Sequence, residues 1–451
     1  MINQPSEVLN KIIENYTGVS LIERLSLFAK SPEPSIAVKA SIEALKYLSS
    51  HSWNSPHIEE IFLPIIERFD NDPIHSKYKN IQWLEHLRVR QARKSEELNA
   101  DNFYHESDID NLKEVIYMNV VNKQFTDAQN MINSSSLNSK SLQLSEISAQ
   151  IGILQGNYSL TINQDKKIES FISSALSNEI YNKRLIKVEI ETYFRIKFLI
   201  IFASFLKKEY DETIQLCSDV IKLSLKANDD NIISSLDILN DAERFGSFIT
   251  KDEIIFSYNF SVLLTQTPVQ LNQTLTEKVF NSFQNSDLDA YKSLFQSITT
   301  ANFKQLFIQL DERFDPFAKL NVFIKKVWES LRLELRYKSY ELYFSLVIKV
   351  SAEHLSNKLN IEINQLIKEV KGFIKDKELE FFFDEQENIF LKAKYDKHEV
   401  FLNKLTAATE NIEIIESKIK DSLISANEKA KNIFADSSQR KPLAGLKGIF
   451  G

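Results

Sequence analysis

The chain has 451 residues, a formal net charge of -7 and one cysteine, Cys217. A single cysteine excludes an intramolecular disulfide, and the acidic balance argues against nucleic acid as the partner. The 43% hydrophobic content allows a large core, and the scarcity of breakers, with 8 glycines and 9 prolines, favours helices over a many-turned β fold.

The sequence shows no membrane anchor. Met1 is not followed by the apolar core of a signal peptide, so we expect an intracellular, reducing setting. The most apolar run, Phe198 to Leu206, has about half of the ~20 residues that a bilayer span requires. We therefore predict that this run forms a buried helix.

Three helices are expected within residues 1–80, which we interpret as an N-terminal helical module. Leu21 to Phe28 forms the first, and the second, Ser35 to Ser50, carries alanines along one face, which allows close helix packing. Ile58 to Phe69 forms the third, and Pro64 within it predicts a kink or a late start.

Residues 81–248 are predicted to form helical repeats. After a charged helix from Ile81 to Leu98, two segments follow one plan, in which a helix and a polar turn precede a second helix that opens with an aromatic residue. The paired helices are Ile109 to Val121 with Phe125 to Ile132, and Arg184 to Leu206 with Tyr210 to Leu225. This plan resembles the tetratricopeptide repeat, although the glycine and tryptophan positions of that repeat are not filled.

We expect these pairs to form an irregular right-handed stack, with Gly152 and Gly156 bracketing a further turn. Helical periodicity continues through residues 249–350. Lys251 to Thr265 is one expected helix, Leu320 to Leu335 closes the stack, and Arg336 to Val350 is expected to supply the first helix of the next subdomain.

The periodicity changes in residues 351–396. Ala352 to Lys358 and Glu362 to Lys375 are predicted helices that a tight turn joins. Two short apolar runs, Leu379 to Phe383 and Ile389 to Ala393, flank a polar stretch, which predicts a β-hairpin. Helix, turn, helix and hairpin is the order of a winged helix, a fold best known for reading DNA.

The charges of this segment favour a protein partner instead. Between Glu362 and Glu378 four lysines are matched by four acids, and the hairpin carries more acids than lysines. A module that neutralises phosphates needs surplus cations on the face that it presents. A nucleic-acid-binding adaptor that uses Lys368, Lys371 and Lys375 is therefore kept only as an alternative function.

A C-terminal bundle helix is predicted for residues 397–434. Its apolar residues alternate steps of four and three, which places them in one seam that requires another helix against it. The seam consists of Phe401, Leu405, Ala408, Ile412, Ile415 and Ile419. Residues 435–451 are polar and then basic, and we expect them to be a flexible tail.

Residues for catalysis or metal binding are not grouped in the sequence. No two of the seven histidines stand two or four residues apart, and for the nearest pair, His51 and His57, solvated imidazoles are the simpler interpretation. Cys217 lies among apolar residues of a helix, which is typical of a buried structural thiol. No phosphate-binding glycine motif occurs. We therefore expect no enzymatic activity, no cofactor and no metal in this chain.

Helical repeats, a winged helix and a C-terminal helix follow one another in the PCI domain, which is shared by the proteasome lid, the COP9 signalosome and a translation initiation factor. Within this group the sequence resembles the family of COP9 signalosome subunit 1. The resemblance rests on Ser20 to Ser50, Lys208 to Glu212, Ile249 to Glu253 and Val350 to Tyr395. It makes residues 249–350 the helical part of the PCI domain and 351–396 its winged helix. In the first repeat, Asn122-Lys123-Gln124 replaces the family's glycine-aspartate turn.

The resemblance implies a non-catalytic scaffold subunit of the COP9 signalosome, located in the nucleus and cytoplasm. That complex removes the ubiquitin-like modifier Nedd8 from cullin-type ubiquitin ligases through a metalloprotease subunit. The implied partners are other PCI-domain subunits, the metalloprotease subunit and cullin-RING ligases, without a membrane. A subunit of the proteasome regulatory-particle lid, which has the same architecture, is the alternative.

The resemblance also implies two subunit interfaces. Winged helices of PCI assemblies pair through sheet edges, which places one interface on Glu380, Phe381, Phe382, Phe383, Ile389, Phe390 and Leu391. Strand alternation leaves open whether Phe381 and Phe383, or Phe382 alone, face the domain core instead. The seam from Phe401 to Ile419 is the second, and is expected to join the C-terminal helices of partner subunits in a common bundle.

Overall fold

The computed structural model describes residues 5–70, 72–100, 109–135, 141–177, 183–229, 248–276, 288–377, 379–392, 409, 412–413 and 415–425. Over these ranges the protein is mainly helical with one small sheet, so the predicted fold class is confirmed at that level. Two compact units are present: unit 1 comprises Met1–Leu346 and His354–Glu362, and unit 2 comprises Val347–Glu353 and Ile363–Gly451. Every helix of the described residues is too short or too polar to cross a bilayer.

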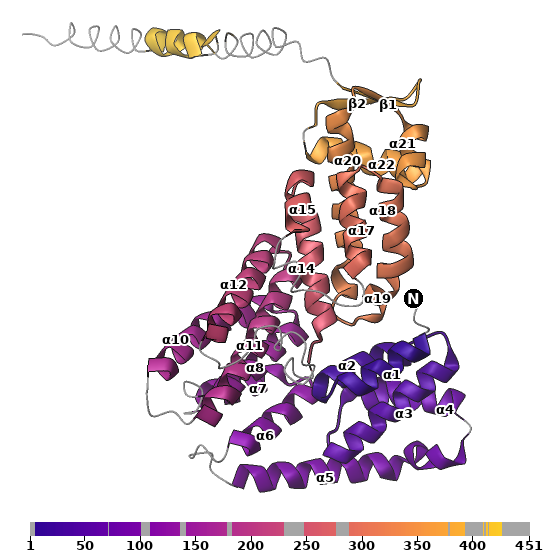
Figure 1. Cartoon of the computed structure of the whole chain (residues 1–451), viewed down its shortest axis with the longest axis vertical. Helices are drawn as coiled ribbons and strands as arrows, with labels where there is room; N and C mark the ends of the chain where they lie inside the picture. Colours follow the sequence, from indigo (N-terminus) through magenta and orange to yellow (C-terminus); the bar gives the residue numbers. More distant parts are fainter. Residues whose placement is uncertain are drawn as a thin grey trace, which may run out of the picture. The chain divides into compact units, whose positions relative to one another are not determined.

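Small side chains let the first helices of unit 1 pack closely. Helices α1 (Pro5–Asn15), α2 (Gly18–Ala29) and α3 (Pro34–His51) lie against one another (Figure 1). The alanines of α3 that face its neighbours are fully buried, as the sequence predicts. The sequence analysis missed helix α1, whose buried residues are Leu9 and Ile12.

Pro64 disturbs the third predicted helix in its interior. Ile58–Phe62 form a wide π-helical turn, η1, which follows helical Pro56 and His57 and continues into α4 (Leu63–Phe69). Proline has no N–H to donate into the preceding turn, which explains the widened turn before it. Pro316 takes the same place after a second π-helical turn, η5 (Leu310–Phe314), at the start of α19 (Asp315–Leu320).

The remaining elements of unit 1 continue the stack of helices (Figure 1). A 3₁₀ segment follows α4, and the predicted repeat helices come next, with each end at most four residues from its predicted position. These elements are η2 (Pro73–Lys79), α5 (Ile81–Ala100), α6 (Ile109–Val121), α7 (Phe125–Ser134), α8 (Leu142–Gln155), α9 (Tyr158–Ile162), α10 (Gln164–Ser177), α11 (Lys183–Leu206) and α12 (Tyr210–Asp229). The later ones are α14 (Lys251–Thr265), α15 (Pro268–Thr274), α17 (Leu288–Thr299), α18 (Phe303–Gln309) and α20 (Lys325–Leu346).

One turn geometry recurs at three helix ends of unit 1. In each, a non-glycine residue with positive φ ends a helix, the next backbone N–H donates to the carbonyl five residues back, and an aromatic residue then opens a new helix. Such left-handed caps satisfy carbonyls that the helix end leaves free. The three sets are Lys123, Gln124 and Phe125; Lys208, Glu209 and Tyr210; and Ala301, Asn302 and Phe303. The first two match the predicted plan, and the third was missed because an alanine, Ala301, holds the position with positive φ.

Gly152 does not form a turn, contrary to the sequence prediction. It lies inside α8, and only Gly156, with φ of 75°, ends that helix. A Cβ at position 152 would clash with Thr161 Oγ1 and stand 3.0 Å from the carbonyl oxygen of Asn157. Gly152 is therefore required by the close approach of α9, which residue type alone does not distinguish from a turn.

Gly152→Ala is expected to lower the free energy of unfolding by about 1–3 kcal/mol, because the methyl group overpacks the α8–α9 contact. Gly372→Ala is the matched control, since Gly372 lies in the helix α22 and its added Cβ meets no atom within 4 Å. That control should be neutral or stabilising by about 0.5–1 kcal/mol. Urea unfolding measures both, and equal effects of the two substitutions would contradict the packing assigned to Gly152.

Two helices with long buried stretches form the centre of unit 1. Phe198 to Leu206 of α11 are all buried, which confirms the prediction for the most apolar run. Helix α14 buries every residue from Glu253 to Leu263. Helices that are apolar on all sides are found in the interior of large domains. The rings of Phe256 and Phe260 stack on each other at 4.2 Å and also contact Trp328 of α20.

A buried ion pair joins the N-terminal helices to this centre. Arg24 of α2 and Glu253 of α14, which are 1% and 0% exposed, stand 2.6 Å apart. The guanidinium also lies 3.8 Å from the ring centroid of Tyr16 and donates to the carbonyl of Phe248. Glu253 in turn accepts from the side chain of Asn321. Segments more than 200 residues apart are thus fixed by one polar cluster.

A second polar contact ties the first repeat turn to α2. Glu23 accepts from Lys123 Nζ, and its Oε1 is 3.3 Å from His57 Nε2. Burial alone would raise the pKa of Glu23, but the bonds to His57 and Lys123 outweigh it and lower the pKa to about 2.

Glu23→Gln is expected to cost up to about 3 kcal/mol of stability at neutral pH, because the pKa of Glu23 is depressed in the folded protein. A carboxylate with a depressed pKa stabilises the fold above its unfolded-state pKa, and this contribution fades as pH falls toward 2. The difference between wild type and variant should therefore narrow by about 1 kcal/mol between pH 7 and about pH 3.5. Urea unfolding across that range tests this, and a pH-independent difference would refute it.

Unit 2 contains the sheet. Its first strand lies where the sequence analysis predicted the end of a helix. The expected helix from Arg336 to Val350 ends at Leu346, in α20, and Lys349–Ser351 form a strand, β1. Next come α21 (Ala352–Leu359), whose last residues belong to unit 1, and then α22 (Ile363–Asp376), β2 (Phe381–Asp384) and β3 (Ile389–Lys392). β2 and β3 are the predicted antiparallel pair.

Candidate partner-binding surface

The sheet of unit 2 has the order β1-β3-β2, with both pairs antiparallel. Across it, Val350, Phe390 and Phe383 stand opposite one another and share one face. The rings of Phe383 and Phe390 are 4.7 Å apart. Helix α22 contacts β2, and its buried residues Leu366, Val370 and Phe373 recur every three or four positions.

The predicted hairpin residues differ in burial. Phe381, Ile389 and Phe390 are buried at 9%, 6% and 0% exposure. Phe382 is 50% exposed, and Glu380 is also exposed. Phe383 and Leu391 are half-buried. The structure thus settles the alternative left open by the sequence: Phe381 and Phe383 share a face with buried Phe390, while Phe382 lies on the other face.

Strand β2 lies at one edge of this sheet. Within the described residues β3 is the one strand that pairs with it. Such an edge can accept a further strand from another chain. Exposed Phe382 lies on this strand, where an added strand would come into contact with it.

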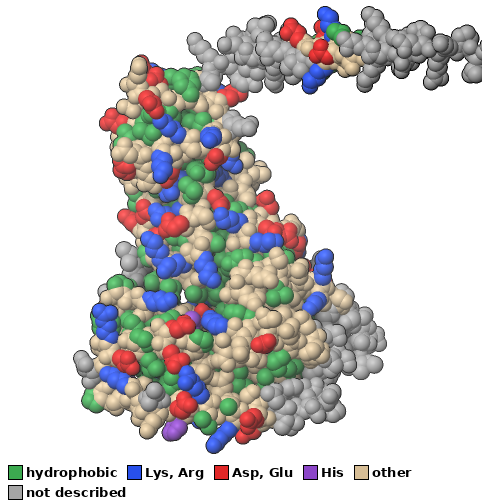
Figure 2. Space-filling model, turned by 180° about the vertical axis from the view of Figure 1, so that it is seen from behind, with side chains coloured by type: hydrophobic (Ala, Val, Ile, Leu, Met, Phe, Trp, Pro, Cys, Tyr) green, Lys and Arg blue, Asp and Glu red, His purple; other side chains and the backbone are tan. Residues whose placement is uncertain are grey.

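A lysine of α22 contacts β2 and the turn of the hairpin. Lys371 of α22 lies 4.6 Å above the ring centroid of Phe383 and 2.8 Å from Glu385 Oε1. This hydrogen bond lowers the pKa of Glu385. Because Lys371 already contacts Glu385 and Phe383 within unit 2, fewer cations remain for the nucleic-acid-binding alternative. Acidic and basic side chains are also interspersed on the face shown in Figure 2.

The C-terminal helix is described at residues 412–413 and 415–425, where it is helical. Ile412, Ile415 and Ile419, which the sequence assigns to the seam, are 62%, 56% and 55% exposed. Phe401, Leu405 and Ala408 lie outside the described residues. Leu423, 64% exposed, extends the same face by one more step of four, a continuation that the sequence prediction missed. We call Ile412, Ile415, Ile419 and Leu423 together the exposed seam.

Groups with catalytic potential are dispersed or buried. No group of three or more His, Cys, Asp or Glu side chains arranged for a metal occurs in the described ranges. His51 stacks on Tyr47 at 4.3 Å, whereas His57 contacts Glu23, so these two histidines have separate structural contacts. Cys217 is fully buried, and burial raises the pKa of its thiol, which disfavours the nucleophilic thiolate.

Comparison with known families agrees with the helical architecture. The family described as the CSN11 N-terminal domain matches residues 12–332, from α1 into α20. A search of curated proteins finds no match. The family match covers more than two thirds of the chain and confirms the predicted group, whereas the assignment to subunit 1 stays a prediction. The chain therefore belongs to the CSN11 N-terminal domain family, a family of COP9 signalosome subunits.

Proposed function

We propose that this chain is a non-catalytic scaffold subunit of the COP9 signalosome. Family membership supports a place in a multi-subunit complex. The observation that carries the scaffold role is the exposed seam, because four large aliphatic side chains on one helical face are each more than half exposed. Contiguous exposed apolar surface of this kind is typical of a protein-protein interface.

Covering the exposed seam would contribute part of the free energy that holds a partner subunit. Fully burying a Leu or Ile side chain contributes about 1.5–3 kcal/mol, so covering the exposed parts of four gives roughly 4–7 kcal/mol before the cost of association. The heptad-like steps suit a partner helix, which would place its own apolar residues between them. A bundle of C-terminal helices from several subunits is the proposed arrangement.

Unit 2 supplies the second proposed interface. The order β1, α21, α22, β2, β3 supports a winged helix of the PCI type, and the edge position of β2 together with exposed Phe382 supports pairing with a second PCI subunit. In the proposed complex a separate metalloprotease subunit removes Nedd8 from cullin-type ubiquitin ligases, in the nucleus and cytoplasm. This chain would position that subunit without contributing catalytic residues.

Placing two charges in the exposed seam should release the chain from its complex. For tagged Ile415→Glu/Ile419→Glu we expect at least about a tenfold loss of co-purifying subunits, because each glutamate must be desolvated in the apolar interface. Ser417→Glu/Ser425→Glu is the matched control. It adds the same charge to the opposite, exposed side of the same helix. The control should retain its partners.

The readouts are the amounts of co-purified chains and the apparent mass by size-exclusion chromatography. If both double variants keep the same partners as wild type, the exposed seam is not the interface. Co-purification with proteasomal ATPases instead of a metalloprotease subunit would favour the proteasome-lid alternative.

A further inference from the structure

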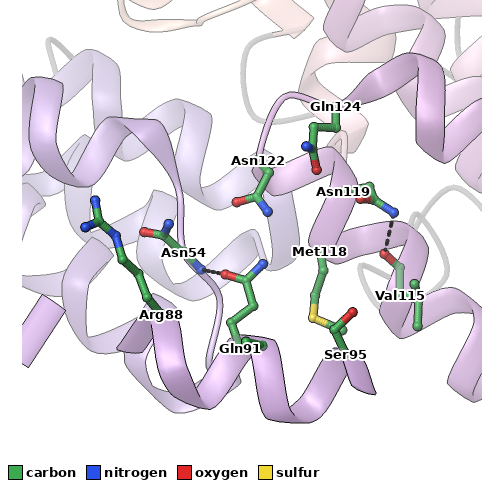
Figure 3. A pocket seen from close by; sticks show the side chains of 10 residues that line it. Asn54, Arg88, Gln91, Ser95, Val115, Met118, Asn119, Asn122 and Gln124 are labelled. Atoms are coloured by element: carbon green, nitrogen blue, oxygen red, sulfur yellow. Dashed lines mark hydrogen bonds between the residues drawn. The ribbon is translucent and has the colours of Figure 1, made fainter. Parts of the chain in front are cut away.

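A polar groove lies between α5 and α6 of unit 1, apart from both proposed subunit interfaces. Its volume is about 340 Å³, within the size range of ligand sites. Helix α5 lines it with positions i, i+3, i+4 and i+7, α6 and the turn after it line it with the same spacing, and the loop residues Asn54 and Gln124 complete the lining (Figure 3). The lining residues are Asn54, Arg88, Gln91, Ala92, Ser95, Val115, Met118, Asn119, Asn122 and Gln124.

Carboxamides dominate the lining of this groove. Gln91 uses its Oε1 to accept from the backbone N–H of Asn54 at 2.7 Å, which leaves its amide NH₂ available. Asn119 donates to Val115 and Met131 inside the protein. Over the ranges that the structure describes, the side chains of Asn54, Asn122 and Gln124 have no hydrogen bond to the protein. Several donors and acceptors therefore remain for a ligand.

The groove combines this polarity with a neutral and partly apolar lining. Its one charged side chain, Arg88, donates to both carboxylate oxygens of Glu59 at 2.9 Å, so its charge is compensated. Val115 and Met118 are apolar and buried, with 4% and 3% exposure. Phosphates and carboxylates would find no uncompensated cation among these residues. The complementary ligand is uncharged, with hydrogen-bonding groups along its length.

The groove is preformed. Glu114 of α6 accepts from Trp53 Nε1 at 2.9 Å and from Lys94 Nζ of α5 at 2.6 Å. Lys94 also donates to the carbonyl of His51 at the end of α3. These contacts fix α3, α5 and α6 around the groove. A ligand would therefore bind without the cost of assembling the site.

We propose that this groove binds an extended peptide segment through its main chain. A carboxamide has the same planar donor and acceptor groups as a peptide unit, so it can pair with main-chain N–H and C=O groups whatever the peptide sequence. The site does not depend on the scaffold function proposed above.

The test of this site uses peptides that are selected from a displayed random library for binding to the full-length chain. Asn122→Leu and Gln124→Met remove carboxamides that the protein does not use internally, so the fold should survive. Each substitution is expected to lower the affinity for a selected peptide by about tenfold, as measured by fluorescence polarisation. N-methylation of the peptide backbone at the contact positions should lower the affinity by a similar factor. Gln82→Met, an exposed position of α5 that does not line the groove, is the control and should leave affinity unchanged.

Three results would overturn the proposal. The first is that no library peptide is enriched. The second is that the selected peptides bind both groove variants as tightly as wild type. The third is binding that survives backbone methylation but requires acidic side chains and falls with added salt, because this would assign recognition to cations instead of carboxamides.

Discussion

Arg24→Met is expected to lower the free energy of unfolding by about 3–5 kcal/mol. The substitution leaves Glu253, which is 0% exposed, without its cation in the centre of unit 1. The side chains of Asn321 and Tyr16 and the backbone N–H of Thr250 still donate to the carboxylate, but neutral donors do not replace the cation beside a buried charge. The α2–α14 junction should therefore fail first. Urea unfolding followed by tryptophan fluorescence measures the loss.

The control for this prediction is Arg88→Met. Arg88 also contacts a carboxylate, that of Glu59, but the two side chains are 43% and 56% exposed. Solvated pairs of this kind contribute about 0–1 kcal/mol. Adding Glu253→Gln to Arg24→Met should recover part of the stability, since the uncompensated charge is then absent. Equal losses for Arg24→Met and Arg88→Met would show that the buried pair does not hold α2 to α14.

Trp328→Ala is expected to cost about 3–5 kcal/mol, the range for large buried aromatic residues. Trp328 is 1% exposed and packs against Phe256 and Phe260 at ring distances of 6.0 and 5.6 Å. Its Nε1 also donates to Asp315 Oδ1 at 2.8 Å, so the substitution both opens a cavity and removes a hydrogen bond. Thermal and urea unfolding would measure the change.

Trp83→Ala provides the comparison, because Trp83 is half-buried and contacts Tyr78 edge-on at 5.2 Å. A loss of about 1–2 kcal/mol is expected there, in proportion to the smaller apolar area. If the two tryptophan substitutions were equally costly, the aromatic cluster around α14 would not be the main stabilising centre of unit 1.

Elements with strong local signals could be predicted from the sequence. Helices α6 and α14 have their predicted ends, since caps and turns such as Lys123-Gln124 or Thr250 mark them locally. The hairpin was predicted because polar residues separate two dense apolar runs. Strand β1, by contrast, has three residues and pairs with β3 about 40 residues later, so no periodicity indicates it.

For the proposed interfaces, the buried ion pair and the groove, the sequence also lacked the information that long-range packing supplies. The sequence left two possible orientations for Phe382, and only the packing of Phe383 on Phe390 decides between them. Arg24 and Glu253 are 229 positions apart, and as isolated letters both suggest solvated helix faces. The carboxamides of the α5–α6 groove come from separate segments of the chain, so their proximity arises only from the fold.

The measurement that tests the central claim most directly is the identity of the chains that co-purify with the tagged full-length protein from its own cells. Mass spectrometry should find several PCI-domain subunits and one metalloprotease subunit in near-equal amounts. A monomer with no companions, or a preparation that contains proteasomal ATPases in their place, would contradict the assignment of this chain as a COP9 signalosome scaffold.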